Sequence, residues 1–208
     1  MHFLYTALIA LTNNFDNISV RIAYSIRGIR ISMLNNIWIS AITFIISTSA
    51  AMAGETIAGT IGKQISSFVS MALLSFIGSY MIFGDYIKRN KNIEVPLKEN
   101  KSRRNNGFLS IFSKPEDADI DDSKYIDFKE ATFLGVALSI NNIGGGLSAG
   151  MIGLNSFFIG LVSAIISFLA LWAGNYMSAI FDRWKFKNKA NIIAGIILIL
   201  IGIKQVIV

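Results

Sequence analysis

Long apolar segments alternate with short polar links along most of the chain. Six segments are candidates for membrane-spanning helices, at residues 3–26, 34–60, 66–84, 130–153, 156–181 and 190–207. A helix needs about 20 residues to cross the hydrocarbon core of a bilayer. Most charged residues lie instead between residues 85 and 130 or between residues 182 and 189. The pattern predicts an all-α, polytopic membrane protein with six transmembrane helices.

Composition and charge placement agree with this class. Hydrophobic residues make up 53% of the chain and charged residues only 15%, whereas soluble domains carry about 25% charged residues. Lys and Arg gather in the links after the first, third and fifth segments, while Lys63 stands on the opposite side. Basic links are normally cytoplasmic, so both termini are predicted to be extracytoplasmic. No basic stripe with interleaved aromatic residues is present, which argues against a nucleic-acid partner.

The two halves of the chain resemble each other. The matching positions are Asp16-Asn17-Ile18 with Asn141-Asn142-Ile143, Gly28-Ile29 with Gly153-Leu154, Asn35 with Asn155, Ser47 with Ser167, Ala53-Gly54 with Ala173-Gly174, and Ile77-Gly78 with Ile201-Gly202. Because each half has three spans, the second half enters the membrane from the opposite side. The prediction is two inverted three-helix repeats, residues 1–84 and 130–208, joined by a cytoplasmic linker at 85–129. Such repeats are typical of secondary transporters, whose substrate site lies near the midplane.

Polar side chains deep in the first and fourth spans are the candidate site. Asp16 is the only acidic residue deep in a span, and a charge at that depth costs about 2.5–3.5 kcal/mol. The predicted metal ligands are Asp16, Asn13, Asn17, Asn141 and Asn142, with Glu55 at the outer end of the second span. Carboxylate and amide oxygens suit Mg²⁺, Ca²⁺ or Mn²⁺. The alternative is that the amides only bond across helices and that Glu55 simply reaches water.

Five of the ten residues from 144 to 153 are glycines, namely Gly144, Gly145, Gly146, Gly150 and Gly153. Glycine inside a helix costs about 1 kcal/mol relative to alanine, so this run needs a reason. Close helix packing is one explanation. A broken or bending helix that exposes carbonyls to an ion is the other, and both stay open.

The linker ends in a segment with the spacing of a calcium-binding EF-hand loop, residues 119–130. The predicted loop ligands are Asp119, Asp121, Ser123, Asp127 and Glu130, with the carbonyl of Tyr125. Lys124 occupies the position where the motif has glycine for a left-handed turn. Ca²⁺ binding at the loop is therefore left open against an acidic linker that caps the fourth span.

Other site chemistries have little support. The chain has no Cys and one His, His2, so a thiolate or histidine site for zinc or iron is not expected. No second acid or base accompanies Asp16 for general acid–base work. We therefore predict that the chain is not an enzyme and holds no tightly bound cofactor.

Four features of the chain resemble the YtaF-like sporulation membrane proteins. They are Asp16-Asn17-Ile18 in the first span, the Asn-rich repeat in the fourth span, the Gly-rich segment after it and the acidic loop before it. The YtaF-like proteins belong with the MntP-type manganese efflux pumps, within the LysE-like group of six-span exporters. The resemblance implies a bacterial inner-membrane protein that exports manganese. It also implies that Asp16 corresponds to the family's aspartate in the first span. Asn141 and Asn142 stand where the pumps have a second aspartate, so the ion and the proton coupling are left open.

The leading prediction is a divalent-cation exporter, with Mn²⁺ as substrate, that works by alternating access within the lipid bilayer. The alternatives are a non-transporting sporulation or calcium-sensing membrane protein, and a LysE-like amino-acid exporter. The driving force and a possible homodimer are left open.

Overall fold

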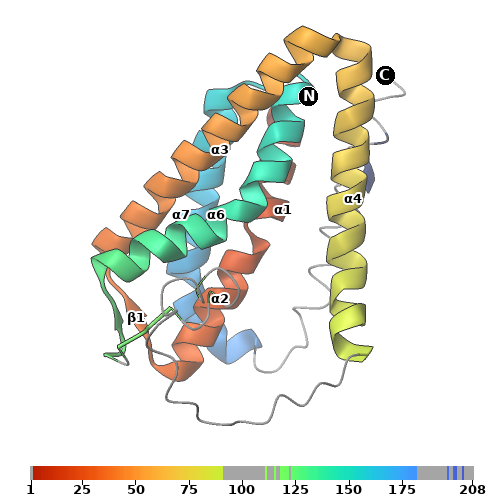
Figure 1. Cartoon of the computed structure of the whole chain (residues 1–208). Helices are drawn as coiled ribbons and strands as arrows, with labels where there is room; N and C mark the ends of the chain where they lie inside the picture. Colours follow the sequence, from red (N-terminus) through yellow and green to blue (C-terminus); the bar gives the residue numbers. More distant parts are fainter. Residues whose placement is uncertain are drawn as a thin grey trace.

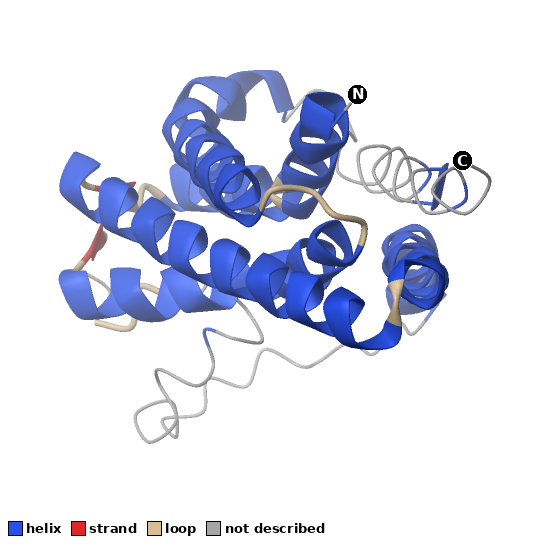
Figure 2. Ribbon diagram, turned by 90° about the horizontal axis from the view of Figure 1, so that it is seen from above, coloured by secondary structure: helices blue, strands red, loops and turns tan. Residues whose placement is uncertain are grey.

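Helices form nearly all of the part of the chain that the computed structural model describes, namely residues 2–90, 111, 115, 118–121, 123–181, 196, 199, 200 and 203. The helices are α1 (His2–Asn13), α2 (Phe15–Arg27), α3 (Met33–Ile61), α4 (Lys63–Asn90), α6 (Phe128–Met151) and α7 (Ser156–Phe181) (Figure 1). Two short strands, β1 (Arg30–Ile31) and β2 (Tyr125–Ile126), lie at one edge of the bundle (Figure 2). The first predicted span covers α1 and α2, and the next four coincide with α3, α4, α6 and α7. Most of the predicted linker and of the sixth span lies outside the described residues.

Several polar side chains of α3 and α7 are buried in the bundle beside apolar ones such as Ile39 and Leu171, while many large apolar side chains of both helices are exposed. The exposed side chains of the two helices include Leu34, Ile37, Ile45, Met52, Phe157, Leu161, Ile165 and Leu169. The buried ones include Asn36, Ser40, Thr43, Ser47, Ser156, Ser163 and Ser167. A helix on the surface of a soluble protein has the opposite arrangement. By length and composition, α3 and residues Ser156–Ala173 of α7 are able to cross a membrane.

Glycines let α3 and α6 run side by side in the same direction. Gly135 packs on Ile39 and Ile42, and further along Gly150 packs on the backbone of Ala51. A Cβ atom on Gly150 would lie 1.9 Å from the Ala51 carbonyl oxygen, so only glycine allows this approach. The glycine run of α6 therefore serves close packing, although Figure 1 also shows α6 changing direction about half way along.

The first predicted span is not one helix, because it breaks at Asn14. The Asn14 backbone (φ −109°, ψ 12°) leaves helical geometry, and its N–H donates to the carbonyl of Leu11 at 3.2 Å. The carbonyl of Ala10, which this N–H would bond in a continuous helix, accepts instead from Asn14 Nδ2 at 2.7 Å. The side chain thus satisfies the backbone group that the break sets free, as burial in an apolar interior requires.

Helices α2 and α6 end in the same way. Gly28 and Gly153 both adopt left-handed backbones, with φ 73° and 77°. Each is followed by a residue whose N–H reaches back five positions, from Ile29 to Tyr24 at 2.8 Å and from Leu154 to Ala149 at 3.0 Å. This is the Schellman pattern, and it occurs at the two glycines that the internal repeat matches.

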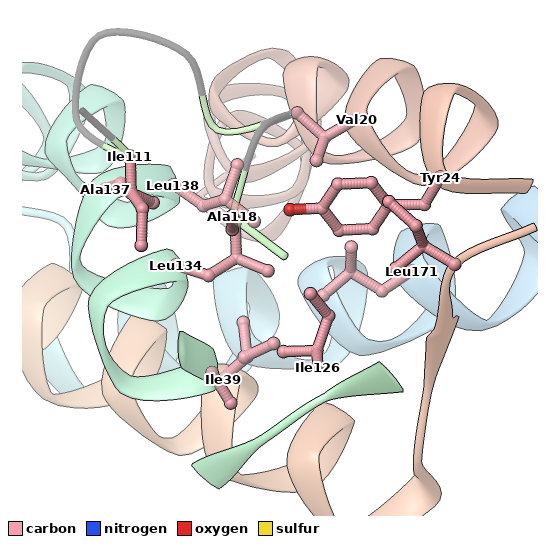
Figure 3. Packing of buried hydrophobic residues seen from close by; sticks show 12 residues of the cluster. Val20, Tyr24, Ile39, Ile111, Ala118, Ile126, Leu134, Ala137, Leu138 and Leu171 are labelled. Atoms are coloured by element: carbon pink, nitrogen blue, oxygen red, sulfur yellow. The ribbon is translucent and has the colours of Figure 1, made fainter. Parts of the chain in front are cut away.

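A hydrophobic cluster attaches the end of the linker to the bundle (Figure 3). Ile111, Ala118 and Ile126 are buried against Tyr24 of α2 and Leu134 of α6. The Tyr24 hydroxyl donates to the carbonyl of Pro115. Strands β1 and β2 pair in parallel, and Asn35 Nδ2 donates to the Ile126 carbonyl at 2.6 Å. Residues 118–121 and 123–130 are therefore held against the end of α2 and the start of α3.

Candidate functional site

Six polar side chains meet inside the bundle, and we call them the interior polar network. They come from both halves of the chain: Asn14 and Asn17 beside the break between α1 and α2, Thr43 on α3, Ser139 and Asn142 on α6, and Ser167 on α7. None is more than 1% exposed. Polar groups at this depth require partners, and members of the network form hydrogen bonds with one another.

The centre of the network is a reciprocal pair of amides. Asn14 Nδ2 donates to Asn142 Oδ1 at 3.3 Å, and Asn142 Nδ2 donates to Asn14 Oδ1 at 3.4 Å. The same Asn14 oxygen accepts from Asn17 Nδ2 at 3.1 Å. The pair joins the helix break of the first half to the middle of α6 in the second.

Hydroxyl groups extend the network to α3 and α7. Asn17 Nδ2 donates to Ser167 Oγ at 2.8 Å. Thr43 Oγ1 lies 3.1 Å from Ser139 Oγ and donates to Ser167 Oγ at 3.4 Å. Sequence reasoning assigned no site role to Thr43 or Ser167. The sequence singled out Ser167 only as the residue that matches Ser47 in the internal repeat.

The predicted site residues have different environments. Asn17 and Asn142 are in the network, and Asn13 is buried, with its amide against Gly145 of α6. Asn141 is exposed on α6. Asp16 is in the first turn of α2, but its side chain lies outside the described residues.

Glu55 is exposed, and its Oε2 accepts from Ser156 Oγ at 3.1 Å. Its position on α3 is about 12 Å along the helix axis from Ser47. Glu55 therefore does not join the interior polar network, and its assignment to a vestibule stays a prediction.

The described network offers neutral oxygens and a helix start. Amide and hydroxyl oxygens are ligands for hard cations, and all members of the network are uncharged. Asp16 follows the break at Asn14, and the start of a helix favours a negative charge in its first turn. The described network can present several neutral oxygens, which a weakly held divalent ion would need in addition to a carboxylate.

The linker loop has the turn that its spacing predicts. Lys124 adopts φ 65°, the left-handed conformation normally given to glycine at this place. Carboxylate oxygens of Asp119, Asp121 and Glu130 all lie within 4.8 Å of one another. These are three of the predicted loop ligands.

The other predicted loop ligands are engaged within the loop. Ser123 Oγ donates to the Tyr125 carbonyl at 2.8 Å. Asp127 caps α6, where its Oδ1 accepts from the Glu130 N–H at 2.7 Å, while Glu130 Oε2 accepts from the Asp127 N–H at 3.0 Å. The acidic segment thus caps the helix, and Ca²⁺ binding stays a prediction.

The acidic groups of the loop differ in pKa. Burial raises the pKa of Asp119, against the opposing effect of its hydrogen bond from the Lys124 N–H. Hydrogen bonds from Ser123 lower the pKa of Asp121. Because the folded loop disfavours the charged form of Asp119, any cation bound there would compete with protons as the pH falls.

Replacing Lys124 with glycine should stabilise the loop. A non-glycine residue in the left-handed region costs roughly 1 kcal/mol, so Lys124→Gly removes that strain without removing a side-chain contact that the loop uses. We expect slower hydrogen exchange at the Arg30 N–H, which donates to the Lys124 carbonyl at 2.9 Å. Lys124→Ala removes the same charge but keeps the strain, and it should not slow exchange. Equal effects of both variants would contradict this account.

These features define a helical membrane protein with a polar interior site. Residues 52–206 match the family described as "Putative manganese efflux pump", and the chain belongs to this family. The resemblance stated from the sequence is thereby confirmed.

Two relatives show how the match is distributed. The chain is 27% identical over 208 residues to "Probable sporulation protein YtaF" of Bacillus subtilis (strain 168), covering 98% of this chain and 99% of that protein. It is 31% identical over 150 residues to "Putative manganese efflux pump MntP" of Clostridium perfringens (strain 13 / Type A), covering 68% of this chain and 62% of that protein. No solved structure matches.

Proposed function

We propose that this protein exports divalent metal ions, with Mn²⁺ as the main substrate, by alternating access of two inverted halves around a mid-membrane site. The proposed site residues are Asp16, Asn13, Asn17, Asn141 and Asn142, with Glu55 at the outer end of the pathway. The observation that carries the proposal is the interior polar network at the helix break, which joins Asn14 and Asn17 to Asn142. The family description supports metal efflux in general.

Packing between the halves supports alternating access. Helix α3 of the first half packs along α6 of the second, and α7 of the second packs along α2 of the first. These two interfaces are related by the internal repeat, as are the helix ends at Gly28 and Gly153. In transporters built from inverted repeats, one half rocks against the other around a site where helices are interrupted. The break at Asn14 is such an interruption.

The membrane placement belongs to the same proposal. We infer a bacterial inner membrane, with both termini outside and the linker in the cytoplasm, from the basic links. The protein then needs the lipid bilayer and its cation substrate as partners, and no resident cofactor.

Flux measurements in reconstituted vesicles test the substrate. Purified protein in liposomes should carry Mn²⁺ saturably, and Ca²⁺, Mg²⁺ and Zn²⁺ added singly should be carried more slowly. Protein-free liposomes give the leak. A folded, reconstituted chain that carries none of the four ions overturns the proposal.

A second candidate is a non-transporting sporulation role. The match to YtaF covers nearly the whole of both chains, whereas the MntP match covers 68% of this one. The described network is also neutral, so a second carboxylate like that of the pumps is not part of it. Binding of Ca²⁺ at residues 119–130 without flux of any ion would favour this role.

A further inference from the structure

Ser47 carries a buried hydroxyl that forms no hydrogen bond with any residue the structure describes. It lies on α3 one turn after Thr43, is 0% exposed, and its Oγ has no hydrogen-bond partner among the described residues. A buried polar group left without a partner costs about 1–3 kcal/mol. Its position inside the bundle calls for a partner in some other arrangement of the helices.

The internal repeat identifies that partner. Asn17 and Ser167 correspond to Asn142 and Ser47 in the alignment of the two halves. Asn17 Nδ2 donates to Ser167 Oγ at 2.8 Å, across the interface between α2 and α7. The corresponding bond, from Asn142 to Ser47 across the interface between α3 and α6, is not made. Asn142 pairs with Asn14 instead.

Ser47 and Asn142 lie at the same level of the bundle. Ser139, Asn142 and Gly146 share one face of α6, since they are spaced by three and four residues. Ser139 Oγ lies 3.1 Å from Thr43 Oγ1. A Cβ atom on Gly146 would lie 3.1 Å from the carbonyl oxygen of Ser47. Asn142 is between these two contact points and therefore beside Ser47.

We propose that Ser47 and Ser167 are paired positioning residues that hold the two alternating states of the transport site. The inference rests on the proposed function, because it assumes that the halves exchange conformations. In the state described here, Asn17 bonds Ser167 and holds the α2–α7 interface closed, while α3 and α6 are in backbone contact without an asparagine–serine bond. In the other state, Asn142 leaves Asn14 and bonds Ser47 across the α3–α6 interface, while Asn17 releases Ser167 and the α2–α7 interface opens. One asparagine–serine bond is present in each state.

The absence of cysteine from the chain gives a direct test. Ala50 on α3 and Ala170 on α7 each lie three residues after their serine, are related by the repeat, and are 8% and 5% exposed. Ala50→Cys and Ala170→Cys reporters are labelled with a membrane-impermeant maleimide added to both sides of proteoliposomes. Each reporter is combined with Ser47→Ala or with Ser167→Ala.

The two serine variants should act in opposite directions. Loss of one net hydrogen bond shifts the equilibrium by about fivefold. With Ser167→Ala, the Ala170→Cys reporter should react faster, and with Ser47→Ala it should react more slowly. The Ala50→Cys reporter lies where α3 packs on Gly146 of α6 in the described state, and it should react at the wild-type rate with both variants. Ser47→Thr keeps the hydroxyl and should restore the wild-type rates.

A merely local role for Ser47 gives another result. Ser47→Ala would then leave the distant Ala170→Cys reporter unchanged, or both reporters would react faster together, and either outcome overturns the inference. The labelling needs no metal, so it is independent of the flux assay. Absence of Mn²⁺ flux in the wild type would overturn the proposed function, while opposite labelling shifts would still support the exchange of hydrogen bonds.

Discussion

Replacing Asp16 with asparagine should abolish Mn²⁺ flux through the reconstituted protein. The substitution keeps the shape of the side chain and one oxygen, but it removes the only acidic group deep in a predicted span. The described network around the helix break contains only amides and hydroxyls. Two unit charges 4 Å apart attract by about 4 kcal/mol at an effective dielectric constant of 20, and each 1.4 kcal/mol is a factor of ten in affinity. Because Mn²⁺ carries two charges, its attraction to the carboxylate is larger still, and the expected loss of ion affinity is at least about a thousandfold.

Asp85→Asn is the matched control for this experiment. It makes the same change of side chain in α4, beyond the predicted end of the third span at residue 84. We expect its flux to equal that of the wild type. Flux is measured in the proteoliposome assay, with the elution profile in detergent as a check of folding. If a folded Asp16→Asn protein carried Mn²⁺ at the wild-type rate, Asp16 would not be a site residue, and the proposed mechanism would lose its basis.

Long apolar runs predicted the described helices, because length and polar flanks are local properties. Helix α3 starts at a Ser32 cap and α6 at an Asp127 cap, and both signals are readable in the sequence. The break at Asn14 is different. It depends on the Asn14 amide bonding Ala10 and Asn142 together, and the second bond joins residues far apart in the chain. No local pattern distinguishes Asn14 from its neighbour Asn13.

The glycine run of α6 shows the opposite case. A broken or bending helix at Gly144–Gly146 was one of two interpretations; α6 changes direction about half way along (Figure 1), but its helical structure continues unbroken to Met151. Side chains of neighbouring helices occupy the space that a side chain would need, since Ile77 packs on Gly144 and the amide of Asn13 packs on Gly145. Glycine frequency alone cannot separate close approach from interruption, because both need a missing side chain.

The candidate site was predicted in part. Asn17 and Asn142 were recognised because amides are costly in apolar spans, and both are buried in the network. Thr43 and Ser167 were missed because hydroxyl side chains commonly bond to their own helix backbone, as Thr43 also does to Ile39 at 3.1 Å. Their contact across helices depends on the relative register of α3 and α7, which the sequence does not determine.

Replacing Gly150 with alanine should strongly destabilise the bundle. The added Cβ atom would lie 1.9 Å from the Ala51 carbonyl oxygen and 2.8 Å from the Glu55 backbone nitrogen. Both are backbone atoms of α3, so no change of rotamer relieves the overlap, and α3 and α6 must separate. Overpacking of a core costs about 1–3 kcal/mol even where side chains can shift, and we expect the upper end of that range. Unfolding in detergent, followed by circular dichroism, measures the change.

Gly59→Ala provides the control for Gly150→Ala within the same pair of helices. Gly59 is also helical, on α3, but a Cβ atom there would have no neighbour within 4 Å. Alanine favours a helix over glycine by about 1 kcal/mol, so this variant should unfold at the wild-type midpoint or slightly above it. A lower midpoint for Gly150→Ala alone supports direct backbone packing of α6 on α3. Equal midpoints for the two variants would mean that the helices are not in this contact, and the register that places Ser47 beside Asn142 would fail with it.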